Sequence, residues 1–326
     1  MVVTGASSGI GRATARAFGA AGARVAVLAR TVDGLEACAR EIEGGGGEAL
    51  VLPLDVSDAA AVQDAADAVV RRWGRLDTWV NDAMVSVFSP VKEMRADEYR
   101  RVTEVTYLGF VHGTLAALRH MLPRDEGQVI QIGSALCYRS IPLQSAYCAA
   151  KAAMRGFTDS LRTELMHDRS GVRVSMVHLP AVNTPQFEVV RTRLPNHPQP
   201  VPPIYQPETI ARAVLHVALH PQRELWVAGS TFKAIWANAW APGLADRYLA
   251  RTGYRSQQAD RPVEPGRPDN VFAPIPGDRG AHGEFDALAR RASVELWLRL
   301  RRGWLAAAVA CGAALVLAGL KAGGGR

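Results

Sequence analysis

Cysteine is scarce in this chain, and its four cysteines form no recognisable set. Cys38, Cys137, Cys148 and Cys311 show no CxxC spacing, and no histidine cluster lies beside them. Structural zinc sites and disulfide frameworks need paired or closely spaced cysteines, so we expect neither, and no metal site is indicated. No secretory signal precedes the first glycine-rich motif. We therefore expect the folded part of the chain to remain in a reducing compartment.

Most of the chain also lacks the positive charge that its formal net charge of +7 suggests. From Arg290 onward, seven basic residues and a single acid, Glu295, account for +6 of that total. A duplex-binding protein would instead carry a basic surface on a recognisable module. The distribution argues against a nucleic-acid partner and is typical of a basic segment that flanks a membrane.

The composition is not that of a disordered protein. Hydrophobic residues make up 48% of the chain and charged residues 21%, which predicts a packed core. A chain of 326 residues can form one α/β domain of about 250 residues with appended segments, or two ordinary domains.

Over residues 1–185, short β-branched runs alternate with longer alanine-rich stretches. The predicted strands are Val2–Val3, Val25–Leu28, Ala49–Leu52, Thr78–Val80, Gln128–Ile132 and Val172–His178. The predicted helices are Ile10–Ala20, Asp33–Glu43, Ala59–Trp73, Val102–Met121 and Ser145–His167. The alternation indicates βαβ units around a parallel sheet. We therefore predict a three-layer α/β fold of the Rossmann type with a doubly wound parallel sheet.

A glycine-rich turn, Thr4-Gly-Ala-Ser-Ser-Gly-Ile-Gly11, lies between the first predicted strand and helix. Glycine lets the backbone turn tightly and approach a pyrophosphate, whose charge is met by free N–H groups at the helix N-terminus. Three glycines alone could also form a simple tight turn. The candidate cofactor contacts in this turn are Gly5, Ser7, Ser8, Gly9, Ile10 and Gly11.

A second group, Ser134, Tyr147 and Lys151, is separated by thirteen and four residues. Tyr147 and Lys151 share one face of a predicted helix, because residues four apart lie above one another. An ammonium near a phenol favours the phenolate and moves its pKa toward neutrality. Ser134 follows a predicted strand, at the edge where open α/β sheets bind ligands. Each residue alone has an ordinary explanation as a buried aromatic, a solvated charge or a helix cap, but the three together favour an active site.

These motifs resemble those of the short-chain dehydrogenase/reductase family over residues 1–250. TGASSGIG is similar to the family's cofactor loop, and Leu54-Asp55-Val56 to its adenine contact. Ser134 with Tyr147-Cys-Ala-Ala-Lys151 resembles its active site. Pro180-Ala-Val-Asn-Thr184 looks like the segment in which a threonine holds the nicotinamide carboxamide.

The resemblance implies a role for each of these residues. Tyr147 would donate or accept a proton, Lys151 would bind the nicotinamide ribose and lower the tyrosine pKa, and Ser134 would steady the substrate oxygen. Asp55, Val56, Asn81 and Thr184 would contact the cofactor, as would Tyr147 and Lys151.

Arg30 decides the predicted choice of cofactor. It ends the second predicted strand, where an acid would bind a ribose 2′-hydroxyl and select NAD. An arginine can instead pair with a 2′-phosphate, so we predict NADP. The alternative is that Arg30 is a solvated turn residue.

Two departures from the family pattern concern the rate of catalysis. Where the family has Asn-Asn-Ala-Gly, this chain has Asn81-Asp82-Ala83-Met84, which places a long side chain near the cofactor. Thr106 occupies the place of an asparagine that supports a water relay to the lysine. Its hydroxyl could keep part of that relay. These changes predict retained cofactor binding and reduced turnover.

We divide the chain into an NADP-binding domain over 1–250, a Pro/Gly-rich linker over 251–284, a basic amphipathic helix over 285–303 and a hydrophobic helix over 304–320. Six prolines between Gln186 and Pro207 predict an irregular excursion that could serve as a substrate lid. Glu208–Leu219 is predicted as a helix and Glu224–Val227 as a strand.

Residues 304–320 form an uncharged run of seventeen residues between basic flanks. As a helix the run would extend about 25 Å, slightly less than a bilayer's hydrocarbon core. We predict a membrane anchor that keeps the catalytic domain cytoplasmic. The alternative is a soluble cytoplasmic protein in which this helix packs against another subunit.

The predicted function is hydride transfer between NADP(H) and a carbonyl or secondary alcohol. Aromatic residues in and after the lid suggest a hydrophobic substrate, although they could equally form core or subunit contacts: Phe187, Tyr205, Trp226, Phe232, Trp236 and Trp240. Alternatives are a membrane-tethered NADP-binding scaffold with weakened catalysis and, with less support, an epimerase or dehydratase. A homo-oligomer is the other partner that the sequence leaves open.

Overall fold

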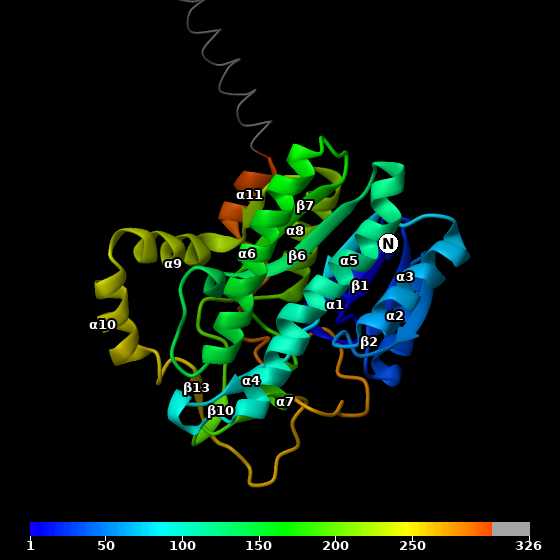
Figure 1. Cartoon of the computed structure of the whole chain (residues 1–326). Helices are drawn as coiled ribbons and strands as arrows, with labels where there is room; N and C mark the ends of the chain where they lie inside the picture. The colour runs from blue at the N-terminus through cyan, green and yellow to red at the C-terminus, as the bar shows by residue number, and fades with distance from the viewer. Residues whose placement is uncertain (302–326) are drawn as a thin grey trace, which may run out of the picture.

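The computed structural model describes residues 1–301 and is built around one seven-stranded parallel sheet (Figure 1). The strand order is β12-β7-β6-β4-β1-β2-β3, and every neighbouring pair is parallel. The strands are β1 (Val2–Thr4), β2 (Arg24–Ala29), β3 (Glu48–Pro53), β4 (Thr78–Asn81), β6 (Gln128–Ser134), β7 (Arg173–Leu179) and β12 (Glu224–Trp226). The predicted doubly wound sheet is thereby confirmed.

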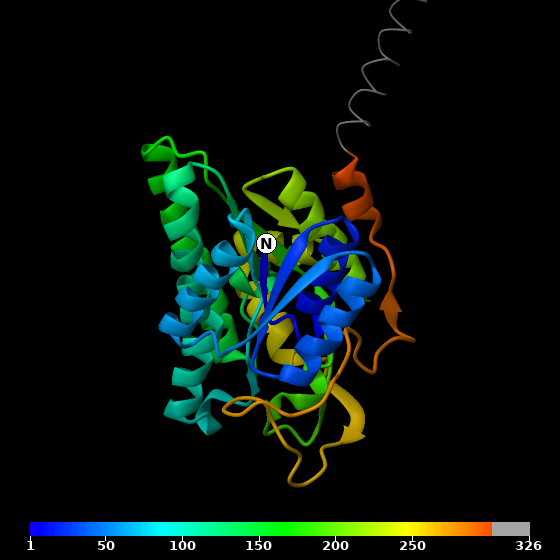
Figure 2. The same cartoon turned by 90° about the vertical axis from the view of Figure 1, so that its right-hand side faces the viewer.

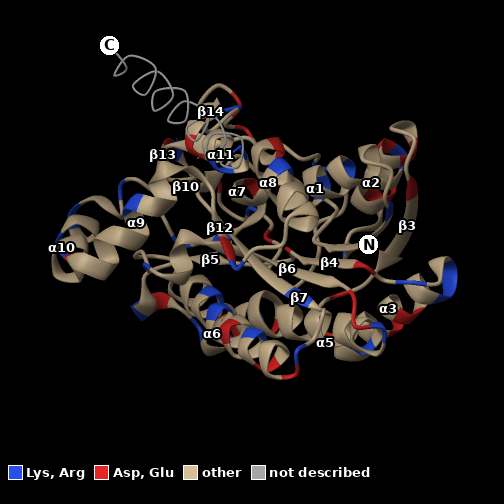
Figure 3. Cartoon of the chain, turned by 90° about the horizontal axis from the view of Figure 1, so that it is seen from above, with Lys and Arg blue, Asp and Glu red and all other residues tan. Residues whose placement is uncertain are grey.

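Helices cover both faces of the sheet, which gives the three predicted layers (Figure 3). One face carries α1 (Gly9–Ala20), α2 (Val32–Gly44) and α8 (Pro207–Leu219), and the other carries α3 (Ala59–Trp73), α5 (Gly109–Met121) and α6 (Ser145–His167). All seven residues of β6 are buried, as expected for a strand with helices on both sides. Each face has its own apolar core, with Trp79 on one side and Ile130 on the other.

The single helix predicted over 102–121 is interrupted. The chain forms α4 (Ala96–Thr103), a π-helical turn η2 (Glu104–Leu108) and then α5. Thr106 lies in the π turn, where its Oγ1 donates to the Val85 carbonyl (2.9 Å) and accepts from the Val85 N–H (3.1 Å). The π turn and these bonds are tertiary features that helical periodicity does not report. π turns of this kind are frequent at functional sites.

The chain after β7 forms short elements around the carboxyl edge of the sheet. Small two- and three-stranded sheets pair β5 (Val87–Phe88) with β9 (Arg191–Thr192), β10 (Asn196–Pro198) with β13 (Gln258–Pro262), and β11 (Ile204–Tyr205) with β8 (Ala181–Val182) and β14 (Ala289–Arg290). The predicted lid thus contains α7 (Gln186–Val189), β9, β10 and β11. Short 3-10 turns are η1 (Val91–Glu93), η3 (Leu122–Arg124) and η4 (Ala135–Cys137). Helices α9 (Ala228–Trp240) and α10 (Pro242–Thr252) project from the body (Figure 1).

The C-terminal predictions need correction. The stretch predicted as a linker, 251–284, is not a free connection, because it runs back along the N-terminal βαβ unit (Figure 2) and bonds to it: the Gly9 N–H donates to the Gly280 carbonyl at 3.1 Å. The amphipathic helix predicted from 285 is limited to α11 (Val294–Leu300) within the described residues, since β14 precedes it.

The helix predicted over 304–320 lies outside the described residues. Among residues 1–301, no helix combines the length and the apolar character that crossing a bilayer requires.

Candidate active site

The loop that leads from β1 into the first turn of α1 can be built only with glycine at two positions. Gly5 has a φ of +71°, and a Cβ there would lie 2.9 Å from the Cα of Ala83. A Cβ on Gly11 would lie 2.4 Å from the Gly5 carbonyl oxygen. The backbone therefore curls tightly enough for its N–H groups and the start of α1 to face an anion.

This loop forms one side of a cleft at the carboxyl ends of β1, β2, β3 and β4, with a volume of about 190 Å³. Nine of the predicted cofactor residues line it: Gly5, Ser7, Ser8, Gly9, Ile10, Arg30, Asp55, Val56 and Thr184. Gly11 and Asn81 do not, and Tyr147 and Lys151 line a neighbouring cavity instead. Gly11 acts instead through the tight packing of the loop itself.

Asn81 lies in the core behind the cleft, with its side chain fully buried. Its amide nitrogen donates to Gln131 Oε1 (3.0 Å), Thr114 Oγ1 (3.2 Å) and the Phe110 carbonyl (3.2 Å). Its oxygen accepts from Trp79 Nε1 at 2.8 Å. The network ties β4 to β6 and α5, so Asn81 supports the sheet edge rather than lining the cavity as predicted.

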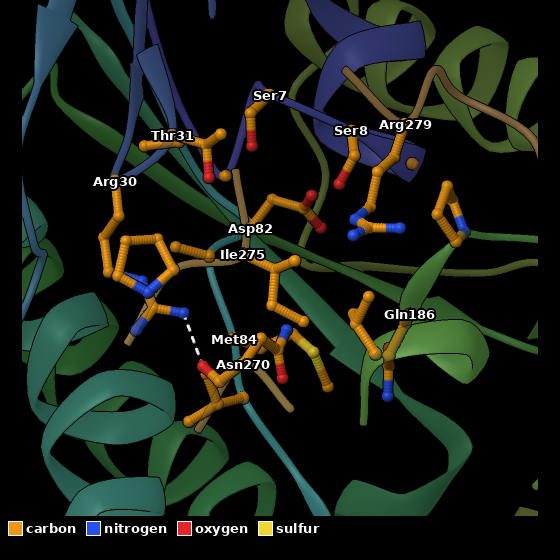
Figure 4. Close-up of a pocket in the computed structure, with 18 of the residues that line it drawn as sticks. Ser7, Ser8, Arg30, Thr31, Asp82, Met84, Gln186, Asn270, Ile275 and Arg279 are labelled. Atoms are coloured by element: carbon orange, nitrogen blue, oxygen red, sulfur yellow. Dashed lines mark hydrogen bonds between the residues drawn. The ribbon is translucent and has the colours of Figure 1, made fainter. Parts of the chain in front are cut away.

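Arg30 lies at the end of β2, at the opposite end of the cleft from α7. Its Nη2 donates to the Asn270 carbonyl at 2.6 Å (Figure 4), and its Nη1 is buried with no hydrogen-bond partner. Burial lowers the pKa of Arg30 and the nearby Asp55 carboxylate opposes that effect. A buried cationic donor without a partner is uncommon, and a phosphate group bound there would satisfy it.

A second, larger cavity of about 320 Å³ adjoins the cleft and contains all three predicted catalytic residues, Ser134, Tyr147 and Lys151. Ser134 ends β6, and the other two come from the first turns of α6. Five residues line both cavities and mark their junction: Ile10, Asp82, Met84, Thr184 and Gln186. Met84 thus forms part of the shared wall.

Tyr147 and Lys151 face the same space. The Lys151 Nζ donates to the Ile132 carbonyl at 2.6 Å and lies 5.6 Å from the centre of the Tyr147 ring. Burial lowers the pKa of Lys151. Burial also raises the pKa of Tyr147 well above its usual range, and only its hydrogen bond with Ser134 works in the other direction. Desolvation of the phenolate is the main cause of the raised pKa, and the lowering by Lys151 that the resemblance implies remains a prediction.

Asp82 is a site residue that the sequence reasoning did not single out. Burial raises its pKa to about 7, although the charge of Lys151 and the Gly11 N–H act to lower it. The clue was available, because an acid replaces the second asparagine of the Asn-Asn-Ala-Gly pattern. The result is a carboxyl group at the junction of the two cavities that titrates near neutral pH.

A buried polar network lies behind Ser134. The Ser134 carbonyl is 3.2 Å from His178 Nδ1, and His178 Nε2 is 3.5 Å from Glu224 Oε2. Tyr138 and Trp226 also donate to Glu224. Burial alone would lower the pKa of His178, but its interactions with the Cys137 side chain and the Glu224 carboxylate raise it to about 9. A charged imidazole therefore fixes the end of β6.

Most of the aromatic residues that were expected to contact the substrate lie outside the second cavity. Phe187 lines the second cavity, whereas Tyr205 is part of the core and Trp226 belongs to the buried network. Phe232 packs against Trp226, and Trp236 stacks on Trp240. Other apolar residues line the cavity instead: Phe88, Ile141, Leu179, Val182, Val201 and Leu249.

The far wall of the cofactor cleft was also not predicted from the sequence. It comes from the stretch predicted as a linker and consists of Asn270, Pro274, Ile275, Gly277 and Arg279. Figure 4 shows Arg279 beside Ser8 and Ile275 among the residues around the cavity. No periodic pattern in the sequence indicated this position.

Comparison with known proteins agrees with this geometry. Residues 1–194 match the family model described as short chain dehydrogenase. An uncharacterized oxidoreductase of Bacillus subtilis (strain 168), YxnA, is 37% identical over 268 residues, which cover 81% of this chain and 75% of the relative. The uncharacterized oxidoreductase Rv1543 of Mycobacterium tuberculosis is 30% identical over 93% of this chain and 83% of its own.

Two solved structures share the fold. A metagenomic short-chain oxidoreductase in complex with NADP superposes with a TM-score of 0.58 at 31% identity, over 69% of this chain and 93% of its own. An alcohol dehydrogenase from the archaeon Thermococcus sibiricus, complexed with 5-hydroxy-NADP, gives a TM-score of 0.59 at 29% identity, over 69% and 94%. With its glycine loop and its Ser134, Tyr147 and Lys151 in adjoining cavities, this chain belongs to the short-chain dehydrogenase family of oxidoreductases.

Proposed function

We propose that this protein transfers a hydride between NADP(H) and a carbonyl or secondary alcohol of an apolar substrate, with Tyr147 as the general acid–base. The observation that carries the proposal is the adjacency of the two cavities. The glycine loop lines one, Ser134, Tyr147 and Lys151 line the other, and Met84 and Thr184 belong to both.

Arg30 supports NADP over NAD. Its Nη1 is a buried donor without a partner at the end of β2, where the ribose of a dinucleotide lies in folds of this type. A 2′-phosphate would satisfy this donor. The two solved relatives contain NADP and 5-hydroxy-NADP, in line with the same preference here. We expect Arg30→Ala to lose the preference.

The bound nicotinamide supplies or accepts the hydride at the substrate carbon. In reduction, Tyr147 would give its phenolic proton to the substrate oxygen, which takes up the electron pair of the carbonyl π bond. Ser134 holds the same oxygen and hydrogen-bonds to Tyr147. Because burial raises the pKa of Tyr147, the phenol is protonated at neutral pH and is ready to donate. Lys151, fixed by the Ile132 carbonyl, places a positive charge beside the phenolate that forms.

The cavity favours an apolar substrate. Its walls are mostly apolar side chains from β7, the lid and α10, and its volume of about 320 Å³ lies in the range of small-molecule sites. Its polar lining includes Ser134 and Tyr147, and glutamines such as Gln144 and Gln257 also contribute. A substrate with one carbonyl or hydroxyl group on a hydrophobic body would match this distribution.

An NADP-binding scaffold with weakened catalysis is a second candidate, favoured by Thr106. A hydroxyl has one proton to donate, and that of Thr106 is given to the Val85 carbonyl. The threonine therefore has no donor left for a water relay to Lys151. This candidate predicts cofactor binding without turnover.

One experiment separates the two candidates. Purified full-length protein is titrated with NADPH by fluorescence and then assayed for NADPH oxidation against a panel of hydrophobic ketones. We expect turnover that Tyr147→Phe reduces by roughly 10²- to 10⁴-fold, with the NADPH dissociation constant nearly unchanged.

Tyr254→Phe is the matched control, because Tyr254 is exposed and outside both cavities. It should retain full activity. Binding of NADPH with no turnover that depends on Tyr147 would favour the scaffold, and NADH turned over tenfold better than NADPH would refute the assignment of Arg30.

A further inference from the structure

Residues 269–283 form an ordered strap along the outer side of the cofactor cleft. The strap follows β13 and passes beside the N-terminal βαβ unit (Figure 2). It reaches the cleft through the residues from Asn270 to Arg279 that line it. The short chain dehydrogenase family model matches residues 1–194. The strap lies after these residues and is therefore outside the part of the chain that matches the family.

Side-chain and backbone contacts hold the strap at both ends. At its start, Arg101 Nε donates to the Val271 carbonyl at 3.0 Å, and Val271 is fully buried. Further along, the Gly277 N–H donates to Asp33 Oδ2 at 2.8 Å, and Asp278 pairs with the buried Arg12. These contacts join the strap to α1, α2 and α4.

The strap occupies one of the donors of the phosphate loop. The N–H of Gly9, the first residue of α1, donates to the Gly280 carbonyl at 3.1 Å. A free N–H at this place would normally face an anion. The residue before Gly280 is Arg279, whose side chain lies in the cleft beside Ser8 (Figure 4). The strap therefore removes one neutral donor and brings a guanidinium to the same place.

Arg279 is weakly held compared with Arg12. Within the described part of the chain, its ion-pair contact is to Glu188 Oε2 at 3.9 Å, and its side chain is 31% exposed. Arg12, by contrast, pairs with both Glu41 and Asp278. Burial and Glu284 raise the pKa of Glu188, and Arg279 acts to lower it. Arg279 is thus free to take an anionic partner.

We propose that Arg279 binds the diphosphate of the dinucleotide and that the strap completes the cofactor site. The inference rests on the proposed function. Arg30 and Arg279 lie on different elements, one after β2 and one beside α1, so they would serve different phosphates. Asp82 lines the same cavity, and its carboxylate would repel a diphosphate. The guanidinium of Arg279 near the loop would offset this repulsion.

The test compares two dinucleotides and two arginines. Dissociation constants for NADPH and NADH are measured by fluorescence titration of full-length wild type, Arg279→Ala and Arg30→Ala. Because both dinucleotides have the diphosphate, Arg279→Ala should weaken both by the same factor, about 10- to 100-fold. Arg30→Ala should weaken NADPH alone. Arg279→Lys should recover part of the loss, since lysine keeps the charge but not the planar fork.

Hydrogen exchange separates a direct contact from a displaced strap. Amides of residues 269–283 should be equally protected in wild type and Arg279→Ala without cofactor, and NADPH should slow their exchange only in wild type. Arg255→Ala, which removes an exposed arginine paired with Asp260, is the control and should bind both dinucleotides normally.

Each remaining outcome refutes a particular claim. If the wild type binds the dinucleotides and Arg279→Ala changes their dissociation constants by less than twofold, this inference alone is overturned. Loss of NADPH affinity without loss of NADH affinity overturns the assignment to the diphosphate, and faster exchange of the strap in the variant overturns direct contact. Failure of the wild type to bind either dinucleotide overturns the proposed function as well.

Discussion

The two walls of the cofactor cleft are built in different ways. The inner wall is the carboxyl edge of the parallel sheet. Further along the same edge, Lys151 and His178 are buried and bond to carbonyls of the sheet. The outer wall is the strap over 269–283, in which only Val271 and Ala281 are buried. Its contacts depend largely on charged side chains such as Asp278, which is 43% exposed.

This difference assigns different physical properties to the two walls. The position of the inner wall is set by core packing and by hydrogen bonds away from solvent, which salt hardly affects. The outer wall depends on partly exposed ion pairs that are individually weak and are screened by salt. The cleft therefore has one wall fixed by the fold and one that can be loosened without unfolding it.

The largest expected effect comes from the charged pair behind the inner wall. Glu224→Gln removes the carboxylate that faces the buried His178, and breaking a buried pair in this way should lower the free energy of unfolding by about 3 kcal/mol near pH 6. The folded-state pKa of His178 is about 9, above its usual 6.5. Its contribution is therefore complete below pH 6.5 and is lost as the pH rises through 9.

Urea unfolding of wild type and Glu224→Gln at pH 6 and pH 10 measures this effect. The difference between the two proteins should shrink at the higher pH. Glu126→Gln, at an exposed surface ion pair, is the control and should change stability by less than about 0.5 kcal/mol. An equal loss at both pH values would mean that His178 is neutral in the folded protein.

The second effect concerns the phosphate loop. In Gly11→Ala the new Cβ would lie 2.4 Å from the Gly5 carbonyl oxygen, a backbone atom that cannot move without displacing the loop. We expect a loss of about 2 kcal/mol in the free energy of unfolding and weaker binding of NADPH. Thermal unfolding and fluorescence titration measure the two changes.

The control for this prediction is the same substitution at an open position. Gly156 lies in α6, and a Cβ added there would have nothing within 4 Å, so Gly156→Ala should stabilise the protein by about 0.5–1 kcal/mol. If Gly11→Ala were equally stabilising, the loop would be more compliant than its contacts indicate.

The inner wall could largely be predicted from the sequence because its causes are local. Runs such as Val25–Leu28 alternate with helices of regular period, and this pattern predicts a parallel sheet built from βαβ connections. Ser134 and Arg30 then lie at the carboxyl edge because Ser134 ends β6 and Arg30 follows β2. Tyr147 and Lys151 face one cavity because four residues make about one helical turn.

The outer wall could not be predicted, because its contacts have no local pattern. Arg12 and Asp278 are 266 residues apart, and a stretch rich in proline, glycine and charge looks the same whether it is free or packed. Asp82 and Asn81 show a related limit of prediction from the sequence. Their neighbourhood in the sequence was identified, but which of the two side chains enters the cavity depends on the backbone at the end of β4.

The smallest expected effect tests the outer wall at its anchor. Asp278→Asn removes one of the two carboxylates paired with Arg12 and leaves Glu41 in place, so the free energy of unfolding should fall by less than about 1 kcal/mol. Exchange of amides over 269–283 should nevertheless quicken, and 0.5 M salt should have a similar effect on wild type. Exchange at β6 should stay unchanged in both cases. If the strap and β6 quickened together, the two walls would unfold as one unit, and the outer wall would be as integral to the core as the inner one.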